Sequence, residues 1–335
     1  MRRKEQRNVR MIVDFQHHFT PRELIKGDPG DRLILNYDAL GAPSYTLHSL
    51  LYDLDEHIRM MDVAGIDAAW LTSAAGMCAD LETSRLVNDK AKKAERDYPG
   101  RFIGAAHAHP LGGAPAFKEL ARCCHEFGFQ GVTICSEFDG KWIDDPAMEP
   151  FWDEVAKLGM FVFVHPALKL NHAQQFDAYD TARGVGREFS LIMATIRLIN
   201  SGVFDRHPEL TVHMAHLSGG IAGMLARIRS FQEKQFWGTA GNPRHGVTPK
   251  RDFDYYIRHN LVFDTAGFAG GIGAVKAGLC EIPASRIVFA TDYPQEIRKR
   301  EVVRDFVKEI RALGADGERI LSGNVTLLLK EPLHA

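Results

Sequence analysis

The fold of this chain is decided by residues 128–166, which read GFQGVTICSEFDGKWIDDPAMEPFWDEVAKLGMFVFVHP. The runs GVTIC (131–135) and MFVFVH (160–165) are almost continuously apolar, as strands are when both faces of a parallel sheet are covered. The segment between them, residues 148–159, has the spacing of an amphipathic helix and closes on Gly159, a residue type that often follows a helix C-terminus. Residues 128–166 therefore predict one strand–helix–strand unit of a parallel sheet.

The same alternation runs through the rest of the chain. Further strand-like runs are expected at residues 11–15, 67–72, 101–107, 211–216, 261–265 and 286–291, and helical patterns at 54–65, 84–99, 114–128, 221–236 and 300–314. Eight strands that alternate with helices, without a GxGxxG motif after the first, favour an α/β fold of the (β/α)8 TIM barrel type over an open doubly wound sheet. We expect a single domain over residues 1–335, with residues 1–9 as a flexible tail.

Two connections are too long for plain crossovers, and they follow the first and fifth strands. Residues 19–52 contain several prolines and glycines, and residues 166–185 are rich in polar residues and glycine. Long connections in compact domains usually serve as lids or binding loops. We therefore expect both to cover the carboxyl mouth of the barrel.

The composition is that of an ordinary globular enzyme and excludes several classes of partner. The 335 residues are 45% apolar and 25% charged, with a formal net charge of −2 and a pI near 6.7, so we expect no nucleic-acid partner. No apolar run has the length of a membrane span, and the basic residues near the N-terminus lack the apolar core of a secretory signal. The five cysteines contain no CxxC pair, which favours reduced thiols in a cytoplasmic protein.

Residues that bind metals stand where four of the apolar runs end. His18 follows the first run after Gln16, His165 ends the fifth, His216 the sixth, and Asp292 follows the eighth. Since the carboxyl ends of barrel strands meet at one mouth, these residues predict one mononuclear metal site. Strand alternation places Gln16 and His18 on the same face, although an amide oxygen is a weaker ligand than imidazole. His216 fits either a ligand or a general acid–base.

Each candidate also has a structural interpretation. Asp292 could be a helix N-cap, and His165 a hydrogen-bonded core histidine. His107 and His109 stand at the end of the third strand with nothing else to pair with, so we interpret them as pocket or structural residues rather than ligands. His213 we interpret as structural.

Four segments together carry a resemblance to a known family. They are VDFQHHFTP (13–21), the stretch 128–166, SGVFDRHPELTVHMAHLSGGIAGMLARI (201–228), and LVFDTAG with RIVFATDYP (261–294). The chain resembles the amidohydrolase-related branch typified by aminocarboxymuconate semialdehyde, γ-resorcylate and 5-carboxyvanillate decarboxylases. The resemblance covers nearly the whole chain. It implies a (β/α)8 barrel with one divalent ion, commonly zinc and in some members manganese.

The family motifs fall on particular residues of this chain. The first-strand motif Asp-x-His-x-His matches residues 14–18, so the resemblance implies His18 as a ligand and places Gln16 where the family has its first ligand. It likewise implies His165 and Asp292 as ligands. The substitution at Gln16 bears on metal affinity and metal identity.

The resemblance also implies residues that act on the substrate. The catalytic histidine of the family matches His216 in AHLSGG. Two arginines that bind a substrate carboxylate match Arg59 and Arg227, the second of which some members supply across a dimer interface. A homodimer or higher homo-oligomer is therefore expected.

These residues favour metal-dependent, non-oxidative decarboxylation of a small aromatic or conjugated carboxylic acid, with His216 or Asp292 as proton donor. Two alternatives stay open. One is a metal-dependent hydrolase (lactonase) or hydratase acting on a small carboxylic acid. The other is a catalytically silent barrel, which Gln16 alone supports.

Overall fold

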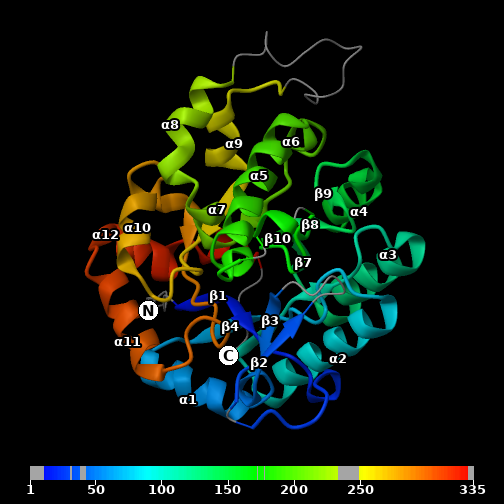
Figure 1. Ribbon diagram of the computed structural model, residues 1–335, viewed down its shortest axis with the longest axis vertical. Helices are drawn as coiled ribbons and strands as arrows, with labels where there is room; N and C mark the ends of the chain where they lie inside the picture. Colours follow the sequence, from blue (N-terminus) through cyan, green and yellow to red (C-terminus); the bar gives the residue numbers. More distant parts are fainter. Residues whose placement is uncertain are drawn as a thin grey trace, which may run out of the picture.

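A computed structural model describes residues 11–30, 32–37, 43–171, 173–176, 178–232 and 249–330, so the expected tail at residues 1–9 lies outside the described residues. Within these ranges the chain forms a ring of short strands surrounded by helices (Figure 1). No helix in the described part is both long and apolar enough to cross a membrane.

Each strand of the ring overlaps a run expected from the sequence, although several strands are shorter than their runs. They are β1 (Val13–His18), β4 (Ala68–Thr72), β5 (Phe102–Gly104), β6 (Ala106–His107), β7 (Gly131–Cys135), β10 (Phe161–His165), β11 (Val212–Met214), β12 (Leu261–Asp264) and β13 (Ile287–Val288). They pair in parallel in the orders β1-β4-β5 and β6-β7-β10-β11-β12-β13. Only Ala105 separates β5 from β6. The two therefore act as one barrel strand, which pairs with β4 through β5 and with β7 through β6.

Backbone hydrogen bonds beyond β13 close the ring. Phe15 N donates to Phe289 O at 3.0 Å, and Asp292 N donates to Gln16 O at 3.0 Å. A parallel bridge between His17 and Tyr293 continues the same contact. With β5 and β6 taken as one, the described strands make an eight-membered parallel barrel, and the predicted fold is confirmed.

The helices cover the outside of the ring, and the longer ones each bury one apolar face. They are α1 (Leu54–Ala64), α2 (Leu81–Asp97), α3 (Gly113–Arg122), α4 (Glu149–Leu158), α5 (Arg187–Asn200), α6 (Val203–Arg206), α8 (Ala222–Ser230), α9 (Phe253–His259), α10 (Ile272–Leu279), α11 (Arg300–Arg311) and α12 (Ala315–Glu318). In α11 the buried residues follow the helical period: Val303, Phe306, Val307 and Ile310. The helix predicted at 221–236 is observed as α8, which already ends at Ser230, and residues 233–236 of the predicted range lie outside the described residues.

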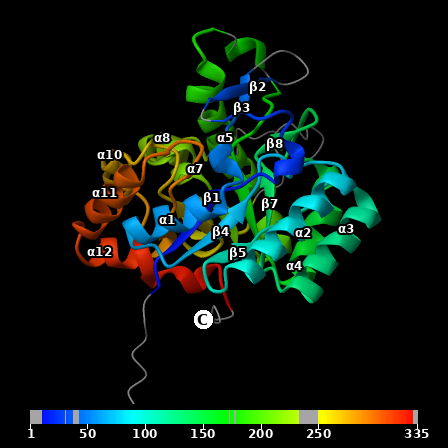
Figure 2. The same ribbon diagram turned by 90° about the horizontal axis from the view of Figure 1, so that it is seen from below.

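Both long connections lie over one end of the barrel, as predicted (Figure 2). The first contains an antiparallel hairpin of β2 (Ile34–Tyr37) and β3 (Pro43–Leu47). The second, ahead of α5, contains two short helical turns at Ala173–Phe176 and Ala182–Gly186. Hydrogen bonds from Thr46 to Gln295 and from Arg187 to the carbonyl of Ser44 hold the hairpin against the mouth.

Candidate metal centre and catalytic site

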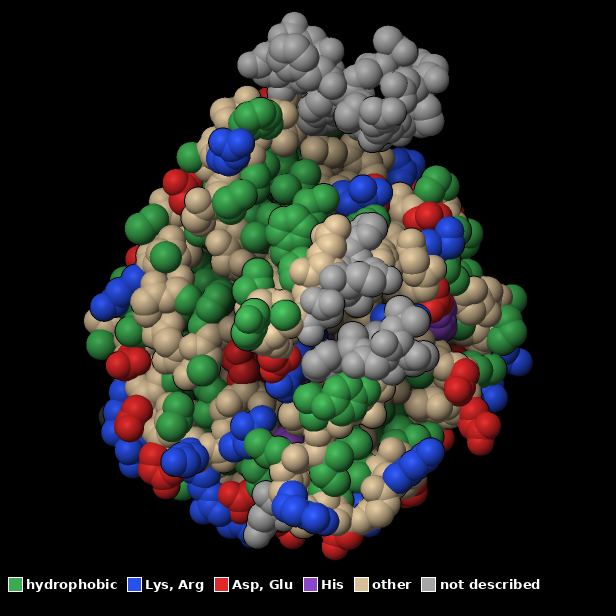
Figure 3. Space-filling view, in the orientation of Figure 1, with side chains coloured by type: hydrophobic (Ala, Val, Ile, Leu, Met, Phe, Trp, Pro, Cys, Tyr) green, Lys and Arg blue, Asp and Glu red, His purple; other side chains and the backbone are tan. Residues whose placement is uncertain are grey.

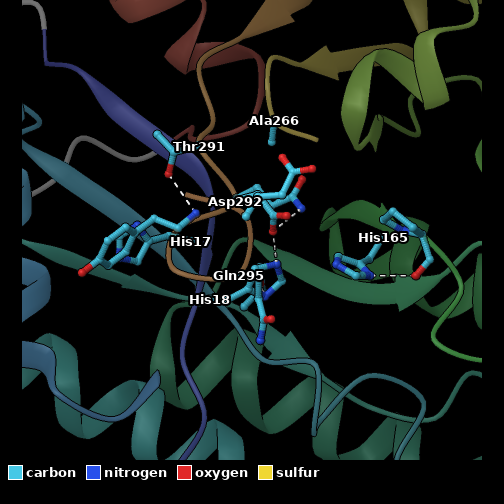
Figure 4. Close-up of polar contacts among 12 residues, drawn as sticks. His17, His18, His165, Ala266, Thr291, Asp292 and Gln295 are labelled. Carbon is cyan, nitrogen blue, oxygen red and sulfur yellow. Dashed lines mark hydrogen bonds and ion pairs between the residues drawn. The ribbon is translucent and has the colours of Figure 1, made fainter. Parts of the chain in front are cut away.

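Three of the predicted ligand residues meet at the carboxyl mouth. The candidate ligand atoms of His18, His165 and Asp292 all lie within 4.8 Å of one another, and all three residues are buried. They come from β1, β10 and the segment after β13, and their polar atoms face a common space (Figure 4). Two imidazoles and a carboxylate are a donor set that suits Zn²⁺ or Mn²⁺.

The two imidazoles are held with one nitrogen each toward this space. His165 Nδ1 lies 2.7 Å from the carbonyl oxygen of Pro166, and His18 Nδ1 lies 3.0 Å from Thr72 Oγ1. Such contacts hold the ring in place and leave Nε2 as a ligand. His18 Nε2 lies 2.6 Å from Asp292 Oδ1, yet it is buried without a hydrogen bond of good geometry. Two candidate ligand atoms this close together can bind the same divalent ion.

Charge in the cluster favours the ligand form of each group. Burial, followed by the neighbouring charge of His18, holds the pKa of His165 well below its usual value, so its imidazole is neutral. Burial alone would raise the pKa of Asp292. The surrounding histidines, His18 first among them, outweigh burial and lower that pKa to about 2, so the carboxylate is ionised.

Gln16 lies beside the triad on the face predicted by strand alternation. Its Nε2 lies 3.1 Å from Asp292 Oδ1 and 3.0 Å from His216 Nε2. Its Oε1 is buried and has no hydrogen-bond partner among the described residues. Gln16 thus connects a candidate ligand to the candidate catalytic histidine, and rotation of its amide would turn the free oxygen toward the metal position.

His216 is the fourth predicted residue at this mouth. Its Nδ1 lies 2.8 Å from Glu188 Oε1, on α5. Burial opposes a charge on the ring, but Glu188 outweighs that cost and raises the pKa of His216 to about 10. The ring is therefore an imidazolium, and because its Nε2–H needs an acceptor, the Gln16 amide has to be rotated so that its oxygen rather than its NH2 group faces His216.

The sequence predicts a strand over residues 211–216 that ends on His216, but in the structure His216 lies beyond the end of the strand. Strand β11 ends at Met214, and Asp264 Oδ1 accepts a 2.8 Å hydrogen bond from His216 N. A left-handed turn follows at His216–Gly220 (α7 in Figure 1), with φ of 56° at His216 and 67° at Gly219. This turn swings the imidazole out of the strand direction and toward the pocket.

Two glycines make room for this geometry. A Cβ on Gly219 would lie 2.0 Å from the backbone oxygen of Glu188, so only glycine lets the turn approach α5 this closely. A Cβ on Gly267 would lie 2.1 Å from the His216 ring. The glycines in AHLSGG are the sequence signal of the close approach.

A cavity of about 160 Å³ opens onto the triad and His216. Its lining includes three arginines, namely Arg183, Arg187 and Arg298. The arginines predicted to bind substrate are not among the lining residues. Arg59 lies on the outer face of α1, where its side chain is 52% exposed and pairs with Glu56 at 2.9 Å. Arg227 is exposed on α8 and lies over the ring of Phe231.

Sequence reasoning therefore missed Glu188, Arg187 and Arg298. A signal existed for the first two, because ARGVGRE (182–188) puts two arginines and a glutamate at the end of the expected lid. Nothing in the local pattern around Arg298 distinguishes it from a surface arginine.

Comparison with known proteins agrees with this geometry. A family model described as an amidohydrolase matches residues 13–324. Gamma-resorcylate decarboxylase from a Rhizobium species is 30% identical over 265 residues, covering 74% of this chain and 79% of that protein.

Two solved structures resemble the whole barrel. The 2,6-dihydroxybenzoate decarboxylase from Rhizobium has a TM-score of 0.77 at 26% identity, covering 96% of this chain and 99% of its own. A dihydroxybenzoic acid decarboxylase from a Polaromonas species, solved with manganese and the inhibitor 2-nitroresorcinol, has a TM-score of 0.77 at 26% identity, covering 96% and 97%. The predicted carboxy-lyase class is confirmed by these decarboxylases, and a divalent cofactor is supported by the bound manganese. The match over residues 13–324 shows that the chain belongs to the amidohydrolase family.

Proposed function

We propose that this chain is a metal-dependent, non-oxidative decarboxylase of a small aromatic carboxylic acid. One observation carries the proposal: a neutral imidazole (His165), an ionised carboxylate (Asp292) and an imidazolium (His216) share one small cavity with two arginines that have no carboxylate partner among the described residues. The named decarboxylases among its relatives support it.

In this proposal His18, His165 and Asp292 hold the ion, and Gln16 Oε1 is the candidate fourth donor. We propose zinc, with manganese as the alternative, since both accept imidazole and carboxylate donors. The bound ion would act as a Lewis acid toward a substrate oxygen.

The proton that replaces the departing carboxyl group comes from His216 in this scheme, or from Asp292 in the alternative. Glu188 holds the Nδ1 side of His216 and stabilises its charged form, so Nε2 carries a proton next to the cavity. Both His216 and Asp292 are buried side chains that line the cavity, so either can reach a substrate bound there.

The test supplies purified protein with Zn²⁺ or Mn²⁺ and incubates it with a panel of hydroxybenzoates that includes 2,6-dihydroxybenzoate. We expect release of CO₂ and formation of the matching phenol, and loss of both in His216→Asn. Absence of CO₂ from every acid in the panel, with metal bound, would contradict the proposal. Incorporation of ¹⁸O from labelled water into the product would instead indicate hydrolysis or hydration.

We also propose a homodimer in the cytoplasm, with the whole chain acting as one domain. A hydrophobic area covers the region of α5, α7 and α8 on the face shown in Figure 3. Val185, Phe189 and Met224 are large hydrophobic side chains exposed there. Arg227 on α8 is then available to a second subunit.

The absence of disulfides among the five cysteines supports a reducing compartment.

A further inference from the structure

The arginines of the cavity differ in how their charges are balanced. Arg183 forms an ion pair with Asp180. Arg187 donates to the carbonyl of Ser44, and Arg298 donates to the carbonyl of Gln295 at 2.7 Å, but neither has a carboxylate partner among the described residues. Two guanidinium groups therefore line the cavity without an ion-pair partner in the described structure.

The surroundings make this arrangement costly unless an anion enters. Burial, followed by repulsion from Arg183, lowers the pKa of Arg187 to about 10. The pKa of Arg298 is lowered as well, first by burial. Arg298 Nε is buried and has no hydrogen-bond partner in the described structure. A buried donor without a partner costs free energy, which an anionic acceptor would recover.

Arg187, its partner Ser44 and Arg298 all lie on segments at the mouth of the barrel. Arg187 is the first residue of α5, directly after the second lid, and its Ser44 partner lies on β3 of the first lid. Arg298 follows Asp292 by six residues on the segment after β13. Both arginines line the same cavity as Asp292 but neither forms an ion pair with it in the described structure, so the two guanidinium groups form a cluster separate from the triad.

The charges of the lining divide into two poles. His216 with Glu188, and Arg183 with Asp180, are neutral pairs. At one pole, a divalent ion bound by the Asp292 carboxylate would leave a net charge of one positive unit. At the other, the two arginines Arg187 and Arg298 stand against one further acidic residue of the lining, Glu296, which leaves at least one positive charge. A ligand with one anionic group at each end would neutralise both poles.

We propose that Arg187 and Arg298 form a second anion subsite, which binds a carboxylate on the substrate ring away from the metal. This inference rests on the proposed function and narrows it: the substrate is a hydroxylated aromatic dicarboxylic acid rather than a monocarboxylic one. Arginine suits the role because its planar fork can hold both oxygens of a carboxylate.

Calorimetric titration tests the subsite without turnover. The probes are benzoate and the three benzenedicarboxylates (phthalate, isophthalate and terephthalate), which lack a ring hydroxyl, added to protein supplied with Mn²⁺. We expect at least one diacid to bind about tenfold or more tightly than benzoate, as a charge-assisted pair at the second pole would produce. Arg187→Gln and Arg298→Gln should each remove most of this difference and change benzoate affinity by less than about twofold.

Two further variants sharpen the result. Arg187→Lys should keep part of the preference, because it keeps the charge but loses the fork. Arg206→Gln, an exposed arginine paired with Glu149 on another face, should change neither affinity. If Arg187→Gln fails to fold, Arg298→Gln carries the same test from a different element.

Two results would overturn the subsite. One is equal affinity for benzoate and for every diacid. The other is an equal loss of affinity for benzoate and for the diacids in Arg187→Gln and Arg298→Gln. The two proposals fail separately. Protein that prefers a diacid through Arg187 but releases no CO₂ from any hydroxybenzoate would contradict the decarboxylase. Protein that releases CO₂ but binds monoacids and diacids alike would contradict the subsite alone.

Discussion

At the scale of single residues, the site differs from its family motif at Gln16. The resemblance places a ligand at this position, and the structure puts the Gln16 amide against both Asp292 and His216. An amide is neutral and a weaker donor than imidazole, so the ion would be held less tightly and would remain more Lewis-acidic. That Gln16 faces the centre followed from strand alternation. Its double contact did not, because His216 is 200 residues away in sequence.

We predict that Gln16→His tightens metal binding, lowering the dissociation constant for Zn²⁺ by about tenfold, because imidazole offers a stronger lone pair at the same place. Competition with a chromophoric chelator measures this constant. Gln295→His is the matched control, since Gln295 lines the same cavity but bonds to Thr46. Unchanged affinity in Gln16→His would mean that Gln16 does not face the ion.

At the scale of elements, the prediction from the local sequence pattern was wrong at the left-handed turn after β11. The apolar run TVHMAH predicted a strand through His216, but the Asp264 carboxylate accepts from His216 N and the chain leaves the sheet. His216, Leu217 and Ser218 all have φ near 50°. Such a conformation costs roughly 1–2 kcal/mol for each residue that has a Cβ. Ser218 Oγ lies 2.5 Å from Thr195 Oγ1 on α5, a contact that holds the turn in place.

We predict different effects from alanine at the two glycines of this turn. Both have positive φ, 67° at Gly219 and 73° at Gly220, so each substitution should lower the free energy of unfolding by about 1 kcal/mol. Gly219→Ala also overlaps the backbone of Glu188, and we expect it to cost about 2 kcal/mol more and to reduce kcat as Glu188 moves from His216.

Gly220→Ala serves as the control, because its Cβ would meet nothing nearer than Phe268 at 3.7 Å. Thermal unfolding and steady-state kinetics on both variants measure the difference. Similar stability and similar kcat in the two would show that the contact between Gly219 and Glu188 is unimportant.

At the scale of the whole molecule, the exposed hydrophobic face near α5 and α8 bears on assembly. Val185 is 56% exposed, Phe189 50% and Met224 43%, and all lie on or next to the elements that hold Glu188 and Arg227. Exposed groups of large apolar side chains often mark interfaces between proteins. A dimer through this face would cover these side chains and bring Arg227 to a second subunit.

We predict that Met224→Glu weakens the dimer, because a charge buried in an apolar interface lacks a partner. Sedimentation velocity over a range of concentrations measures the dissociation constant, which should rise about tenfold or more. Val302→Glu on α11 is the control: its side chain is 40% exposed but lies on a different helix, and it should leave association unchanged. A monomer at every concentration in the unmodified protein would contradict the proposed dimer.

The sequence by itself determined the barrel, the two lids and three residues of the candidate metal centre. These features follow from local order: strand and helix periods, glycine after helices, and polar residues at strand ends, all of which a parallel barrel brings to one mouth. Only the tertiary structure decided that Glu188 lies against His216, that Arg187 and Arg298 line the cavity, and that Arg59 stays outside. The physical reason is that the apolar and polar residues of the lid segments follow neither the strand period nor the helix period. The direction of their side chains depends on packing between segments far apart in the chain, such as Ser44 against Arg187.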